Sequence, residues 1–180
     1  MNNNYYFIII AFFLLSLASC NKKNDDKTAG IEKEFLWHDN LQLTDIPDIT
    51  VKGFLDGTEV KFAYINFERW RGSNDNVINF SLVVPVQKCG SVDGFTGFSL
   101  INKGNPINNG HWLKSKFEDD SKSYQAFIYS GGKKSSSSWN CALSIENISD
   151  KTVTGKIALF FNDEKRSWIA GKFEALICNN

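Results

Sequence analysis

The clearest pattern in the chain is the alternation of apolar and polar residues over its last third. Apolar side chains recur with a period of two in residues 139–145, 153–161 and 169–177. Successive side chains of a strand point to opposite faces, so this period predicts three strands that each bury one face. Short polar segments at 149–151 and 162–166 separate these strands. We therefore expect a three-stranded antiparallel meander at the C-terminal end.

Residues 48–138 show shorter versions of the same pattern. Asp56-Gly57 is a strong hairpin signal, because both central positions of a type I′ turn favour positive φ. It separates a strand over 49–54 from one over 58–67, whose Val60, Phe62 and Tyr64 should share a face. Further strands are expected over 77–84, 95–101, 112–117 and 123–129, the last two pairing with each other. Polar loops are expected over 69–76, 86–94, 102–110 and 130–138.

This spacing of elements defines the fold class. About eight or nine strands at spacings of about 8–12 residues are typical of an all-β fold, here a single antiparallel β-sandwich. Residues 31–44 have apolar positions separated by charged ones, and we expect a short helix or an irregular segment there.

The N-terminal residues have a different character. The apolar run over 5–15 suits a signal peptide and is shorter than the roughly 20 residues that span a bilayer. It is followed, after Ser16, by Leu17-Ala18-Ser19-Cys20, which resembles the lipobox of bacterial lipoproteins. One departure is that residues 1–4 contain no Lys or Arg. The resemblance implies a signal peptide over 1–19 and a diacylglycerol anchor, usually with a third acyl chain such as palmitate, on Cys20.

The segment after Cys20 reads as a tether. Residues 21–30 contain no apolar side chain larger than that of alanine, so they cannot bury surface. We expect a flexible tether over 20–34 and the β-sandwich domain over 35–180. The Lys22-Lys23 and Asp25-Asp26 pairs resemble the export signal of Bacteroidetes lipoproteins. That resemblance implies the outer face of the outer membrane, and the alternative is its periplasmic face.

A second resemblance concerns the domain. Residues 143–147, 153–157 and 170–173 resemble the ending of small lipid-anchored β-sandwich lipoproteins of Bacteroidetes, and residues 54–58 resemble their first hairpin. This chain has Ile157 where that group usually has an aromatic residue. The group is largely of unknown function. The resemblance therefore implies fold and location, and no functional residue other than Cys20.

The length, charge and cysteines of the chain limit what we expect of its domain number, partners and disulfides. The chain has 180 residues, enough for a leader and one domain, and its 20 basic and 20 acidic residues cancel. Such a balance gives no reason to expect a nucleic-acid partner. Cys141 is in phase with the buried positions of its strand, whereas Cys178 is out of phase with its neighbours. We expect either no disulfide or one that involves Cys89.

No catalytic, metal or cofactor motif is present. The serine run 135–138 reads as a flexible loop, and the acidic groups at 118–120 and 163–164 fall in predicted turns. There is no Cys-x-x-Cys pair and there are only two histidines, so we expect no zinc site. A calcium loop at 74–76 would lack the terminal glutamate of an EF-hand. We therefore expect a protein that is not an enzyme.

Tryptophans are the best functional hint, because five are many for this length. Trp70 lies between Arg69 and Arg71 at a predicted loop, and Trp112 follows an Asn/Gly-rich loop. Exposed tryptophans stack on sugar rings or anchor a protein partner. The hypothesis is a membrane-anchored binding module for a glycan or protein ligand, using these four residues. The alternatives are a self-protection or inhibitor lipoprotein against a toxin or enzyme, and an enzyme whose site the sequence does not mark.

Overall fold

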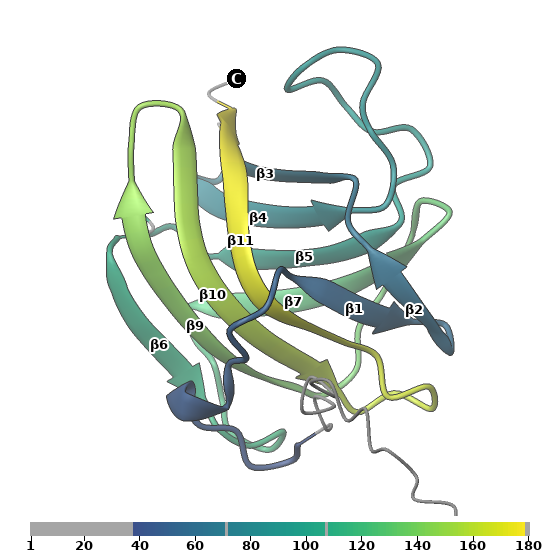
Figure 1. Cartoon of the computed structure of the whole chain (residues 1–180), viewed down its shortest axis with the longest axis vertical. Coiled ribbons are helices and arrows are strands. Elements are labelled where there is room, and N and C mark those ends of the chain that lie inside the picture. The colour runs from purple at the N-terminus through teal and green to yellow at the C-terminus, as the bar shows by residue number, and fades with distance from the viewer. Residues whose placement is uncertain (1–37, 71, 107, 179–180) are drawn as a thin grey trace, which may run out of the picture. The chain divides into compact units, whose positions relative to one another are not determined.

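The computed structural model of the chain describes residues 38–70, 72–106 and 108–178 (Figure 1). The expected leader, lipid-bearing Cys20 and tether lie outside the described residues. The described part is almost entirely β, which confirms the predicted fold class. Its elements are a 3-10 helix η1 (Leu43–Asp45) and strands β1 (Lys52–Leu55), β2 (Thr58–Lys61), β3 (Tyr64–Trp70), β4 (Asp75–Ser81), β5 (Gly97–Asn102), β6 (Gly110–Lys114), β7 (Tyr124–Ser130), β8 (Lys133–Ser135), β9 (Trp139–Ile148), β10 (Thr152–Phe161) and β11 (Trp168–Cys178).

The strands form one curled sheet whose two halves face each other (Figure 1). One half has the order β6-β9-β10-β11 and the other β3-β4-β5-β7-β8. The end of β11 joins them by pairing with β3 in parallel, so the sheet is mixed rather than purely antiparallel. The start of β11 pairs instead with β1, which forms a hairpin with β2. The described residues therefore form eleven strands, where the sequence predicted about eight or nine.

The main core fills the space between the two halves. Aromatic rings cross it: Phe80 of β4 contacts Phe173 of β11 at 5.5 Å between ring centroids, and Phe98 of β5 stacks on Phe161 of β10 at 5.8 Å. The in-phase residues of the C-terminal meander all pack here, as the alternation predicted. Cys141 is among them and is a fully buried free thiol.

A smaller cluster covers the outer face of β9, β10 and β11. Leu41 is fully buried there beside Phe117 and Phe160, and its backbone N–H donates to the carbonyl of Ser115 at 2.9 Å. Ile46, the residue that directly follows η1, packs against the same cluster. Residues 38–51 are therefore mostly irregular with one 3-10 turn, and the part of the expected segment 31–44 before residue 38 lies outside the described residues.

The hairpin at Asp56-Gly57 is confirmed, with φ of 51° and 83° at its two central residues. The strand expected over 58–67 is wrong as a single element. The chain changes partner after Lys61, because β2 pairs with β1 whereas β3 pairs with β4. The alternation slips there: Phe62 packs on the core, and Tyr64 lies on the opposite face.

Three further expectations were wrong. Strands β6 and β7 do not pair with each other, because the chain crosses between the halves after Lys114, so that β6 pairs with β9 and β7 with β5. Strand β4 ends at Ser81, whose hydroxyl accepts from the Val83 backbone N–H at 3.1 Å, and Val84 is exposed. Strand β3 in turn continues through Trp70 and β4 begins at Asp75, so the bounds expected for the loop over 69–76 were too wide.

The described residues include no helix of the length and apolar character that would be needed to traverse a bilayer.

Candidate functional site

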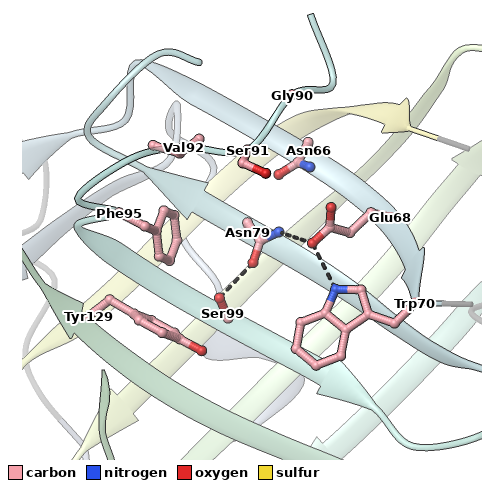
Figure 2. Close-up of a pocket in the computed structure, with 10 residues that line it drawn as sticks. All are labelled: Asn66, Glu68, Trp70, Asn79, Gly90, Ser91, Val92, Phe95, Ser99 and Tyr129. Carbon is pink, nitrogen blue, oxygen red and sulfur yellow. Dashed lines mark hydrogen bonds between the residues drawn. The ribbon is translucent and has the colours of Figure 1, made fainter. Parts of the chain in front are cut away.

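A pocket of about 220 Å³ opens on the outer face of β3, β4, β5 and β7 (Figure 2). The sheet forms its floor, and the connection between β4 and β5, residues 82–96, forms one wall. The residues that line it are Asn66, Glu68, Trp70, Asn79, Gly90, Ser91, Val92, Phe95, Ser99 and Tyr129.

Strand alternation places the polar floor. Asn66, Glu68 and Trp70 occupy every second position of β3, while Ile65 and Phe67 in the opposite phase pack on the core. Strand register then aligns the neighbours: Asn66 lies opposite Asn79 of β4, which lies opposite Ser99 of β5. Three adjacent strands thus present a row of polar side chains on one face.

A chain of hydrogen bonds connects this floor (Figure 2). The Ser99 hydroxyl donates to Asn79 Oδ1 at 2.6 Å, and Asn79 Nδ2 donates to Glu68 Oε1 at 3.1 Å. Trp70 Nε1 donates to the same Glu68 oxygen at 2.9 Å. The indole and the amide are therefore held in fixed orientations by one carboxylate.

Aromatic rings line both sides of the floor. Figure 2 shows Phe95 and Tyr129 on one side and Trp70, with Glu68, on the other. Phe95 and Tyr129 meet edge to face at 4.9 Å between centroids. Burial raises the pKa of Tyr129. Trp70 is 40% exposed, which leaves part of its ring available to a ligand.

A disulfide fixes the loop wall. Cys89 is bonded to Cys178, the last residue of β11, and the next three residues after Cys89 line the pocket. Of the two alternatives drawn from the sequence, the structure has the bridge that involves Cys89. Cys178 leaves the core face as predicted but is buried beneath the loop that it anchors.

Of the four residues predicted to bind a ligand, the three that the structure describes do not form one site. Trp70 lines the pocket. Arg69 occupies the opposite phase of β3, and its Nη2 donates to Asn74 Oδ1 at 2.9 Å. Arg71 lies outside the described residues. Trp112 does not border a loop surface: it is half-buried in β6, with its ring 4.2 Å from Tyr124 and packed against the core.

Sequence reasoning missed the polar floor, which includes Glu68, Asn79 and Ser99. The signal was present in the positions that alternate with the core residues, where polar side chains occur within 66–70 and at 79 and 99. It was hidden because the strand over 64–70 was assigned the wrong phase and ended too early. The expected polar loop then separated Trp70 from the residues that share its face.

Other buried polar groups in the described ranges have structural roles. Burial lowers the pKa of Lys114, whose Nζ donates to the carbonyls of Lys116, Phe117 and Trp139 at 2.6–3.0 Å. Asp75 is paired with Lys103 at 2.9 Å and accepts the Gly104 backbone N–H. Within these ranges, no three His, Cys, Asp or Glu side chains are grouped so as to hold a metal ion.

Comparisons with family models, with curated proteins and with solved structures found no match to this chain.

Proposed function

We propose that the protein is a lipid-anchored module of the outer envelope, displayed at the cell surface, that binds a glycan in the pocket over β3, β4, β5 and β7 without transforming it. One observation carries the proposal: aromatic rings and a fixed hydrogen-bond network occupy the same sheet face. Trp70, Phe95 and Tyr129 provide the rings, and Glu68 and Asn79 are part of the network. The anchor rests on the lipobox at residues 17–20.

A sugar suits this combination of groups. Its ring has apolar C–H faces that pack on aromatic side chains and hydroxyl edges that need hydrogen-bond partners. The volume of about 220 Å³ is below the range of about 300–1,000 Å³ typical of drug-sized ligands, so one or two sugar rings suit it better than a long chain. An open pocket on a strand face also admits an internal residue of a longer glycan.

Binding without hydrolysis is supported by the number of carboxyl groups. Glycoside hydrolysis usually needs two carboxyl groups on either side of the scissile bond. Glu68 is the single carboxyl group among the ten lining residues, and it already accepts two hydrogen bonds. Its position suits orientation of a ligand better than proton transfer.

A glycan array probed with the detergent-solubilised full chain tests the proposal. We expect a defined set of glycans to bind, and Trp70→Ala to weaken binding by about 30-fold, the loss for a typical aromatic hot spot of about 2 kcal/mol. Val86→Ala is the control, because Val86 is a fully exposed residue of the loop 82–96 that does not line the pocket. An array without binding, or equal effects of the two substitutions, would show that the pocket is not a glycan site.

A further inference from the structure

The three side-chain hydrogen bonds described in the pocket floor are all directed toward Glu68. A carboxylate can only accept, so the Asn79 group that contacts it must be the NH₂ end. The Asn79 carbonyl then faces Ser99, which must donate its hydroxyl proton to it. Trp70 also donates, since an indole has no acceptor. The direction of the network follows from chemistry alone and does not depend on how the amide was assigned.

This direction commits the donors that lie closest to Glu68. The Trp70 indole N–H, the Ser99 hydroxyl and one Asn79 N–H are already committed. The second oxygen of Glu68, Oε2, has no hydrogen-bond partner among the described residues, and the Tyr129 oxygen retains acceptor capacity. A ligand that approaches Glu68 Oε2 therefore meets an acceptor without a partner, and it should present a donor at that point.

The charge of the pocket also favours a ligand that donates to Glu68. Glu68 is the only charged side chain among the ten lining residues. A ligand that covers it removes water from the carboxylate, which is costly unless the ligand supplies a counter-charge. The faces of Trp70, Phe95 and Tyr129 also attract cations within about 6 Å. An anionic ligand would gain from none of these groups.

We infer that the pocket selects a glycan carrying a free, protonated amino group, which pairs with Glu68 Oε2 while the sugar ring packs on the aromatic side chains. This inference rests on the proposed glycan function and specifies its substrate class. It distinguishes amino sugars from their N-acetylated, neutral and acidic counterparts.

An NMR titration of the full chain measures this preference. The Trp70 indole N–H is the reporter, because it donates to Glu68. The probes are the 2-amino, 2-acetamido and 2-hydroxy forms of glucose, galactose and mannose, together with glucuronic acid and ethanolamine. We expect at least one free-amine sugar to bind at least tenfold tighter than both of its counterparts, and glucuronic acid not to bind.

Substitution at Glu68 assigns the preference to its charge. Glu68→Gln keeps an oxygen that can accept from Trp70 and Asn79, so we expect a folded protein that has lost the tenfold preference. Glu174→Gln, at an exposed glutamate of β11 outside the pocket, should retain it. Thermal unfolding of both variants checks that the fold is intact.

The outcomes separate the two proposals. Equal or tighter binding of the acetamido or hydroxy forms overturns the amine inference and leaves the glycan proposal standing. Ethanolamine binding as tightly as the amino sugars supports recognition of the amine by Glu68 but overturns the glycan proposal. If no probe moves the Trp70 resonance, and the glycan array is also blank, both are overturned. A preference that survives Glu68→Gln also overturns the amine inference.

Discussion

Removal of the Cys89–Cys178 disulfide is expected to destabilise the domain and to open the pocket. The bond joins residues 89 positions apart and is the covalent link between the loop 82–96 and the end of β11. In the chain-entropy model, closing a loop of that length stabilises the fold by roughly 4.6 kcal/mol at 25 °C. That is a large fraction of the roughly 5–15 kcal/mol that holds a typical domain together.

The perturbation is the double substitution Cys89→Ser/Cys178→Ser, and the assay is equilibrium urea denaturation. We expect the free energy of unfolding to fall by about 4–5 kcal/mol and the thermal midpoint to fall by about 10–20 °C. Reductant should produce the same loss in the wild type and none in the variant. The free thiol Cys141 is fully buried, and burial raises its pKa, so it should not contribute to the response.

The loop wall gives the second readout of this experiment. Residues 90–92 line the pocket directly after Cys89, so ligand affinity should fall even where the variant is still folded. A change in unfolding free energy below about 1 kcal/mol would refute the stabilising role of the bond. Unchanged affinity in a folded, bridge-free variant would refute its role in forming the pocket wall.

Three further predictions concern the core, titration and the anchor. Leu41→Ala should lower the free energy of unfolding in urea by about 2–5 kcal/mol, because Leu41 is fully buried. Leu43→Ala, at a partly exposed neighbour, should lower it by less than about 1 kcal/mol. Equal losses would contradict the packing of Leu41 in the smaller cluster. Burial raises the pKa of Tyr124 to about 12. The neutral phenol therefore contributes about 3 kcal/mol to the free energy of unfolding below pH 10, and this contribution is lost as pH rises through 12. A Tyr124→Phe variant should lack this loss, and identical pH profiles of the two proteins would contradict the prediction. In denaturant without reductant, thiol titration should find one thiol per chain, Cys141, if Cys20 is lipidated, and a second thiol would contradict the anchor.

The part of the fold that the sequence predicts best is the C-terminal meander. Its strands are long, and short turns join strands that are neighbours in the sheet. The alternation of apolar and polar residues is therefore enough to place Leu143, Ile157 and Phe173 in the core. Asp56-Gly57 is equally local, since the turn requires little beyond its own two residues. Local periodicity and local turn chemistry are thus sufficient where pairing is between sequence neighbours.

Pairing between distant segments could not be predicted in this way. The parallel contact of β11 with β3 and the separation of β6 from β7 depend on how the two halves close on each other. The phase slip near Ala63 follows from that closure, and it determines which face Trp70 occupies. The same slip explains why Trp70 was identified from its residue type while Glu68, beside it on the floor, was missed.

The proposed ligand site consists of the polar floor and the aromatic rings around Trp70. Its most direct test is a ¹⁹F NMR titration of the full chain labelled with 5-fluorotryptophan, which gives one resonance for each of the five tryptophans. The Trp70 resonance is identified by its loss in Trp70→Phe. We predict that the sugars that bind shift this resonance and leave those of the core residues Trp112 and Trp139 in place. Binding that shifts Trp112 or Trp139 while Trp70 stays unchanged would contradict the proposed site.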